Sequence, residues 1–297
     1  MYTNERIIED QTTDAYRGFV VVSPSKVLWM GAMFGLAFVG GYLTFSSELL
    51  IVFLVTTSVS LCLGHSLGMH RRLIHKSYQC PLWLEYFFVH LGVIVGLAGP
   101  YGMIKTHDMR DWAQRQVHCH DYFGHRQPMW KDFLWQVFCE IRLQHPPRLK
   151  IELSVSQDHI YQWMEKTWML QQLPLGVLLF FLGGLPYVIW GICVRVSVSV
   201  FGHWFIGYFA HNEGHRDWHV QNASVQGHNV PFAALITMGE SYHNNHHAFP
   251  GSAKLALEEG QLDVGWIVLK FLEKIGLVWD LVEPDFLPVR EELERLA

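Results

Sequence analysis

Four long apolar segments, arranged as two pairs, constrain this fold more than any other feature of the sequence. A helix needs about 20 residues to cross the roughly 30 Å hydrocarbon layer of a bilayer. The first pair covers residues 27–45 and 49–64, with a short SSE turn between them. The second pair covers residues 170–187 and 188–209, with a GGLP break between them. The pattern predicts two transmembrane helical hairpins.

The composition agrees with a membrane protein and excludes one large class of partners. Half of the 297 residues are hydrophobic and only 16% are charged, which is unusual for a soluble domain. The net charge is -5 and the basic residues are scattered, so no basic surface is expected to bind nucleic acid. Five cysteines without a CxxC pair indicate buried thiols in a reducing compartment.

A fifth apolar run, residues 81–103, carries Glu85 and His90 and ends in a GLAGPYG stretch. If this run also crossed the membrane, the histidine-rich segments on its two sides would lie on opposite faces of the bilayer and could not meet. We therefore expect it to be an interfacial or re-entrant helix, which is permitted where it packs on protein.

The basic residues predict the orientation. The turns at 46–48 and 183–187 contain no Lys or Arg. Nearly all the basic residues fall on the opposite side of the membrane, which should be the cytoplasm. Residues 1–26, 65–166 and 211–297 are thus expected to form a cytoplasmic helical cap that includes both termini. The exception, Arg195, lies inside the fourth span, where it either faces a cavity or a partner, or instead snorkels or makes a structural ion pair. The whole chain, residues 1–297, is expected to be one all-α domain in a bacterial inner membrane.

Histidines cluster at the predicted cytoplasmic ends of the spans. GHSLGMHRRLIHKSY places His70 and His75 five residues apart, with His65 just upstream. A histidine here is ordinarily a satisfied polar residue at the membrane boundary, but repeated clusters of neutral imidazoles indicate a metal site.

The last cluster, GESYHNNHHAFP, aligns three histidines on one helical face, and His211 ends the fourth span. Seven or more imidazole nitrogens without a cysteine pair favour two ions of a redox metal over a four-coordinate zinc site.

These motifs resemble the histidine boxes of integral-membrane fatty-acid desaturases of the acyl-CoA desaturase type, and the order of spans and boxes is similar over about residues 25–285. The resemblance implies two iron ions, O2 as co-substrate, and the introduction of a double bond into a fatty acyl chain. It also implies an external electron donor, either ferredoxin-like or a b-type cytochrome with its reductase. By position in the boxes it implies these metal ligands: His70, His75, His107, His211, His243, His246 and His247.

The second box departs from the family pattern. Where the family has HxxHH, this chain keeps His107 but carries Arg110 and Asp111, and Gly207 replaces an asparagine four residues before His211. We favour Asp111 as a ligand, because it lies four residues after His107 on the same helical face and offers an oxygen. Two alternatives stay open. One of His118, His120 and His125 enters the site, or one iron is weakly bound or absent.

Oxygen-dependent desaturation of an acyl-CoA, acyl-carrier or acyl-lipid substrate is the expected function. An acyl or lipid hydroxylase is the nearest alternative, because the same ligand set suits both oxidations. A non-catalytic homologue that binds metal or lipid is a third possibility. The segment after Leu255 is amphipathic at helical spacing, which is typical of a cap packed on the domain or on the membrane surface.

Overall fold

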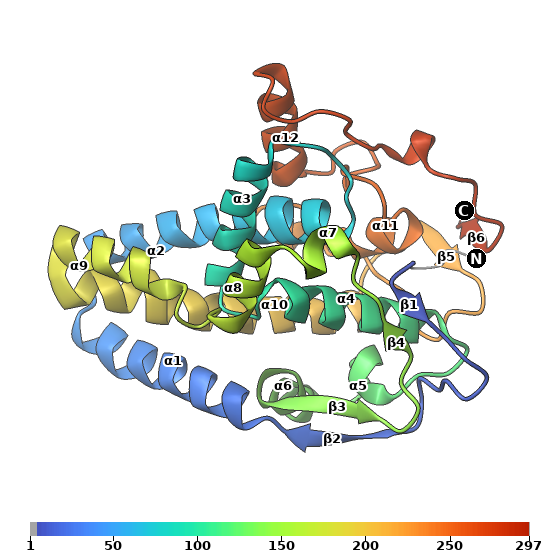
Figure 1. Cartoon of the computed structure of the whole chain (residues 1–297), viewed down its shortest axis with the longest axis horizontal. Coiled ribbons are helices and arrows are strands. Elements are labelled where there is room, and N and C mark those ends of the chain that lie inside the picture. The colour runs from blue at the N-terminus through green and yellow to red at the C-terminus, as the bar shows by residue number, and fades with distance from the viewer. Residues whose placement is uncertain (1–4, 297) are drawn as a thin grey trace.

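A computed structural model describes residues 5–296 and is mostly helical. Its longer helices are α1 Pro24–Leu43, α2 Ser47–Val59, η1 Ser60–Ile74, α3 Leu82–Ile94, α4 Pro100–Arg115, α6 Met129–Phe138, α8 His159–Lys166, α9 Gln172–Val188, η2 Ile189–Val194, α10 Arg195–Asn212 and α12 Val264–Lys274. Shorter ones are α5 Asp121–Gly124, α7 Leu153–Ser156, η3 Pro231–Ala233, α11 His243–Ala248 and η4 Pro284–Phe286. Figure 1 shows the longest helices extending to one side and the other elements gathered at the other side with both described chain ends.

Three helical stretches within residues 5–296 are long and apolar enough to cross a membrane: Pro24–Leu43, Ser47–Ile74 and Gln172–Asn212. Only 17% of the apolar window in the first and 28% in the last is buried by protein, so most of their hydrophobic surface has no protein contact. Lipid is the environment that suits such a surface.

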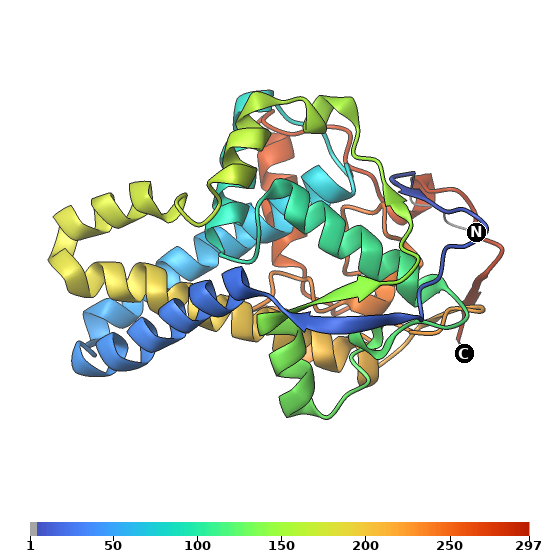
Figure 2. The same cartoon turned by 60° about the horizontal axis from the view of Figure 1, so that its bottom comes forward.

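The third stretch is not one straight helix. Gly183 and Gly184 have non-helical backbone angles, and Gly184 has a φ of 69° that favours glycine. Figure 2 shows the helix reversing direction at this point. The break lies at the GGLP sequence, where a turn was predicted.

The run expected at 81–103 forms two elements instead of one. The sequence GLAGP interrupts it, so α3 ends at Ile94 and α4 begins at Pro100. In Figure 1, α3 lies crosswise to α1 and α2. It packs closely on η1 because the contact is made through glycine: a Cβ on Gly68 would lie 2.4 Å from the carbonyl oxygen of Phe88.

Arg195 is buried completely and has a structural role. It donates hydrogen bonds to the carbonyl oxygen of Ile94 at 2.6 Å, to that of Gly191 at 2.7 Å and to Oε1 of Gln172 at 2.5 Å. Ile94 is the last residue of α3, where helical carbonyls lack partners and the helix dipole favours a cation. Arg195 therefore faces polar partners inside the protein, two carbonyls and an amide, and it neither snorkels nor forms an ion pair among the described residues.

Three short antiparallel strand pairs correct the expectation of an all-helical chain. They pair β1 Ile7–Ile8 with β4 Arg148–Leu149, β2 Gly18–Val22 with β3 Cys139–Leu143, and β5 Trp218–Val220 with β6 Leu293–Arg295. The β2 sequence GFVVV is rich in β-branched residues, which favour extended structure. These pairs fasten both terminal segments to the cap that surrounds the histidines.

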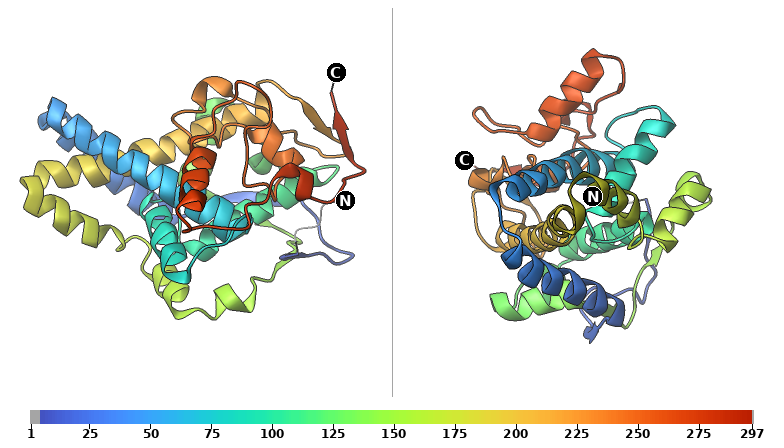
Figure 3. Two further views of the ribbon diagram at one scale, coloured as in Figure 1. Left: turned by 90° about the horizontal axis from the view of Figure 1, so that it is seen from above. Right: turned by 90° about the vertical axis from the view of Figure 1, so that its left-hand side faces the viewer.

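The C-terminal helix α12 is amphipathic, as expected. Its buried residue Leu269 belongs to a core cluster with Leu67 of η1, whereas Ile267, Phe271 and Ile275 are exposed. Figure 3 shows α12 on the outside of the bundle, away from α1 and α6. All five cysteines are buried free thiols, in agreement with the sequence reading.

Candidate metal centre

The first histidine-rich segment is a π-helix. η1 continues α2 without interruption, and the backbone N–H of His75 donates to the carbonyl oxygen of His70 at 3.0 Å, an i to i+5 bond. This hydrogen-bonding pattern places residues five apart above one another. The five-residue spacing of His65, His70 and His75 therefore forms one stripe, which a regular α-helix would spread over a wider arc.

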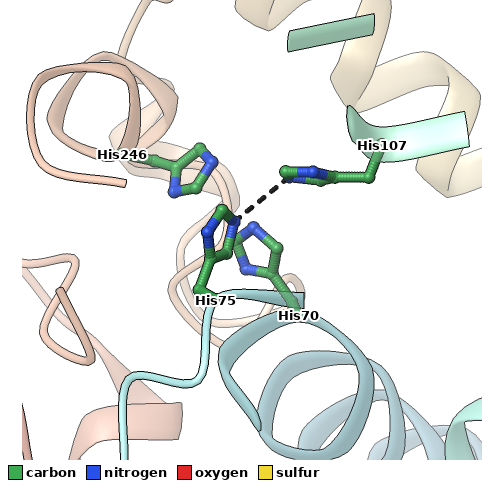
Figure 4. Close-up of side chains that lie close together, drawn as sticks. All are labelled: His70, His75, His107 and His246. Atoms are coloured by element: carbon green, nitrogen blue, oxygen red, sulfur yellow. Dashed lines mark hydrogen bonds between the residues drawn. The ribbon is translucent and has the colours of Figure 1, made fainter. Parts of the chain in front are cut away.

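The first cluster joins four imidazoles from three separate parts of the chain. His70 and His75 come from η1 and its end, His107 from α4 and His246 from α11. One ring nitrogen from each lies within 4.8 Å of those of the others, and His75 Nε2 is 3.2 Å from His107 Nε2. Figure 4 shows the four rings facing a common centre.

The second cluster contains His211, His243 and His247. His243 Nε2 lies 2.9 Å from His211 Nε2 and 3.1 Å from His247 Nε2. Metal–nitrogen bonds of about 2.1 Å meeting at right angles put neighbouring nitrogens about 3 Å apart, so these spacings suit the edges of a metal coordination shell. The short helix α11 contributes to both clusters, which fixes them side by side.

Three of these imidazoles have a contact at Nδ1 that orients the ring. His70 Nδ1 is 2.6 Å from Glu240 Oε2, and His107 Nδ1 is 3.1 Å from Asp108 Oδ1. His211 Nδ1 donates to the carbonyl oxygen of Gly207 at 2.6 Å. Occupying Nδ1 directs Nε2 inward, the arrangement in which metal-binding histidines are commonly held.

His246 is the clearest indication that a ligand belongs here. Its side chain is 2% exposed, and neither ring nitrogen has a hydrogen-bond partner in the described part of the chain. A buried imidazole with two unpaired nitrogens is costly. A metal ion bound in the first cluster would give one of these nitrogens a partner, so the residues present fit a metal.

Electrostatics keep most of these histidines neutral. Burial, reinforced by neighbouring histidines, puts the pKa values of His75, His243 and His246 well below the ordinary value of 6.5. Burial also lowers the pKa of His247, to about 4. Neutral imidazole is the form that binds metal. The pKa of His107 is an exception, because the carboxylates of Asp111 and Asp108 outweigh the lowering effect of burial and raise it.

Asp111 is a member of neither cluster, but its charge acts on histidines of both. Its charge acts on His75 and His107 of the first cluster and on His243 and His247 of the second. Burial would raise its pKa, but His107 and Arg115, whose Nη2 is 3.7 Å away, lower it, so the group is a carboxylate at neutral pH.

The three alternative histidines have different environments. His118 is exposed, and His120 accepts a hydrogen bond from the backbone of Tyr122 as the N-cap of α5. His125 stacks on His211 with ring centroids 5.2 Å apart, but its Nδ1 is 2.8 Å from Asp132 and its Nε2 contacts Arg110. His125 lies where a side chain at Gly207 would reach, since a Cβ there would be 3.7 Å from Nε2. None of the three is part of either cluster.

The residues that support the histidines of the first cluster were not identified from the sequence. Arg6 donates to the carbonyl oxygens of Leu73 and Ile74 at the end of η1, and it also bonds Asp108 and Glu152. Glu240 lies within the GESYHNNHHAFP motif, and a carboxylate so close to these histidines was the sequence signal that could have identified it. The Arg6 contact spans 102 residues to Asp108, and nothing local in the sequence indicates it.

The asparagines of HNNHH position the histidines of α11. Asn244 Oδ1 accepts from the backbone N–H groups of Asp217 and Trp218, at 2.8 and 2.9 Å. Asn245 accepts from Asn229 at 2.9 Å and donates to the carbonyl oxygen of Leu255 at 2.7 Å. A helix of six residues is too short to hold its own direction, so these bonds set where its imidazoles point.

The fold and site together define a class of protein: a mostly helical membrane protein with two adjoining histidine clusters suited to metal. Comparison with known proteins makes the class specific. The family model for fatty acid desaturase matches residues 46–261. The sn-1 stearoyl-lipid 9-desaturase of Anabaena variabilis is 32% identical over 216 residues, which cover 72% of this chain and 77% of that protein.

Two plant proteins are also similar. The Delta-9 acyl-lipid desaturase 1 of Arabidopsis thaliana is 31% identical over 79% of this chain and 74% of its own length. An acyl-CoA 5-desaturase of Anemone leveillei is 28% identical over 92% of this chain and 81% of its own length. The chain belongs to the fatty acid desaturase family, whose members are oxidoreductases that desaturate fatty acyl chains in a lipid environment.

Proposed function

We propose that the protein is an O2-dependent desaturase of fatty acyl chains in membrane lipids, with two iron ions held by the two histidine clusters. The first cluster, formed by His70, His75, His107 and His246, would hold one ion. The second, formed by His211, His243 and His247, would hold the other, with Asp111 supplying the oxygen ligand that replaces a missing imidazole. The buried, unpartnered ring of His246 is the observation that carries this proposal.

The proposed topology has four crossings. The apolar helix α1, the stretch α2 with η1, and the two arms of the helix that breaks at Gly183 and Gly184 supply them. With four crossings, both termini and the metal centre lie on one side, and the basic residues near the span ends favour the cytoplasm for that side. Residues 1–297 then form one domain, with α3 in the interface and the remaining elements as the cap. Similarity to cyanobacterial proteins favours a bacterial inner membrane.

The chemistry divides between the metal and the chain. Bound iron would supply the redox chemistry: O2, reduced with electrons from the donor protein, would take up the two hydrogens lost from adjacent carbons of the acyl chain. The protein's residues hold the ligand nitrogens in place, through Glu240 for His70 and Asp108 for His107. The spans exclude water from the acyl chain beneath the clusters, which prevents side reactions.

Electrons come from a separate protein in this proposal. A ferredoxin-like protein or a b-type cytochrome with its reductase would deliver them at the cytoplasmic face. The lipid-linked substrate is favoured over a CoA ester because the 32%-identical relative carries a stearoyl-lipid name. The names of the relatives differ in double-bond position, so that position is a question for measurement.

Lipid analysis of a bacterial host that expresses the chain tests the proposal, with a His246→Ala variant as its control. The expected result is a new unsaturated acyl chain in air, none without O2, and none in the variant. Product with 16 mass units more would instead support the hydroxylase. Unchanged lipids from a protein that contains two irons and is supplied with a working donor would support a non-catalytic homologue.

A further inference from the structure

A second pair of histidines lies below the metal centre and belongs to neither cluster. His65 of η1 and His203 of α10 have ring centroids 4.9 Å apart and planes at 82°. His65 precedes His70 by one turn of the π-helix, so it lies directly beneath that residue. His203 precedes His211 by eight residues, or about 12 Å along the helix. The pair is therefore within one acyl chain length of the proposed irons.

His203 faces the interior of the helix bundle. Helical spacing puts it on the same face as Val196, Val200 and Ala210, all buried, and opposite the exposed residue Phe201. Yet the His203 side chain is itself exposed. Its free surface therefore opens inward, on the side where His65 lies, and not towards lipid. This is where an acyl chain lying under the clusters would pass.

No hydrogen bond to either ring is seen within residues 5–296, and Nδ1 of His65 is buried without a partner. A plain hydrocarbon chain passing here would leave these nitrogens unsatisfied, which is unfavourable in a low-dielectric site. Two imidazoles supply too few ligands for a structural metal site. An occupant that carries a hydrogen-bonding oxygen would satisfy both rings.

We propose that His65 and His203 form a polar subsite for an oxygen-bearing group, such as a hydroxyl, on the acyl chain of the substrate. The inference rests on the proposed function, because it presumes that the acyl chain runs beneath the clusters. The hydroxyl donates to one imidazole and accepts from the other. The subsite would then select chains that carry oxygen at a fixed distance from the reacting carbons.

Binding measurements test the subsite without relying on turnover. The full-length protein in detergent is loaded with a fluorescent polyene fatty acid, and octadecanoic acid and its mid-chain hydroxy isomers are compared as displacing ligands. We expect at least one hydroxy isomer to bind about fivefold or more tightly than octadecanoic acid. Equal displacement by every isomer and by the plain chain would overturn the proposal.

Variants then assign the preference to the two rings. His203→Leu and His65→Leu should each reduce it to within about twofold, with octadecanoic acid binding and iron content unchanged. His203→Gln, which keeps a hydrogen-bonding group, should retain part of the preference. His159→Leu removes an exposed histidine of α8 and serves as the matched control.

Each further outcome also decides the matter. A preference that survives in both leucine variants contradicts the proposal, as does loss of iron from either variant, which would make the pair part of the metal site. If one variant does not fold, the other variant and the wild-type comparison still decide. A clear isomer preference in a protein that makes no unsaturated lipid would sustain the subsite while the proposed desaturation fails.

Discussion

The two histidine clusters share the short helix α11, which contributes to both, but they differ in completeness. The first cluster has four imidazoles, and two of them, His70 and His107, are oriented by carboxylates. The second has three imidazoles, of which His211 is oriented by a backbone carbonyl, and the charge of Asp111 acts on histidines of both clusters. All of the sequence departures from the family pattern fall beside the second cluster.

This difference indicates that a metal site can change one ligand type while the helices that carry the ligands stay in place. Helix α4 carries His107 on the first cluster and presents Asp111 one turn later, towards both. The Arg6 clamp on η1 and Asp108 supports only the first cluster. We therefore expect one firmly held metal position and one that is more sensitive to substitution.

The largest effect should follow from removing a ligand of the first cluster. His246→Ala deletes the buried ring that has no other partner and leaves a gap among three imidazoles. Desaturated lipid should fall at least about 100-fold, and iron should fall to one ion per chain or fewer. Iron analysis of purified protein with gas chromatography of host lipids measures both. Wild-type iron content and product in this variant would contradict the assignment of the first cluster as a metal site. His118→Ala, which removes an exposed histidine, is the control.

Replacing Asp111 tests the incomplete cluster. Asp111→Ala should lower activity by about 10- to 100-fold and reduce iron by up to one ion per chain, whereas Asp111→His should keep both ions by supplying a nitrogen. Metal titration of the two purified variants beside wild type measures this. If Asp111→Ala binds as much iron as wild type, and as tightly, the carboxylate is not a ligand.

A smaller effect is expected behind the first cluster. Glu240→Gln keeps the size of the side chain but removes the charge next to His70 Nδ1. Loss of an outer partner of a metal ligand ordinarily costs 10- to 100-fold, and we expect about 10-fold here because Gln can still accept a hydrogen bond. Steady-state turnover at saturating iron reads this out. Glu273→Gln, on the surface of α12, is the matched control, and equal loss in both variants would refute a specific role.

The smallest expected effect is the loss, in acid, of the stability that comes from the contact between Arg6 and Glu152. Burial would raise the pKa of Glu152, but hydrogen bonds from Arg6 and Lys76 lower it from 4.5 to about 2. The folded state therefore gains stability from this carboxylate above pH 4.5, and loses it as pH falls towards 2. Glu152→Gln should melt a few degrees below wild type at neutral pH, with the gap closing in that acid range. Thermal unfolding in detergent across pH measures it, and a constant gap at every pH would contradict the account.

Much of the frame was predictable because it follows from local pattern. Apolar length predicted the helical stretches and GGLP predicted the break at Gly183, since these depend on hydropathy and backbone freedom alone. The histidines within GESYHNNHHAFP were evident from their spacing. The short strand pairs were not, because each depends on a partner more than 70 residues away.

The supporting contacts could not have been predicted for a related reason. The bond from Arg6 to Asp108 and the placement of His125 beside His211 arise only when distant segments pack. The π-helical form of η1 also has no recognised sequence signal apart from the five-residue histidine spacing itself. Asp111 lies one helical turn after His107 on α4, and its role as a ligand stays a prediction.

Mössbauer spectroscopy of the purified, iron-57-loaded protein, combined with the number of irons per chain, is the sharpest test that the chain holds two different iron positions. Two iron ions per chain are predicted, giving two quadrupole doublets of equal area, because one position is surrounded by imidazole nitrogens and the other also by a carboxylate oxygen. Less than one iron per chain, or a single doublet from equivalent ions, would contradict the account.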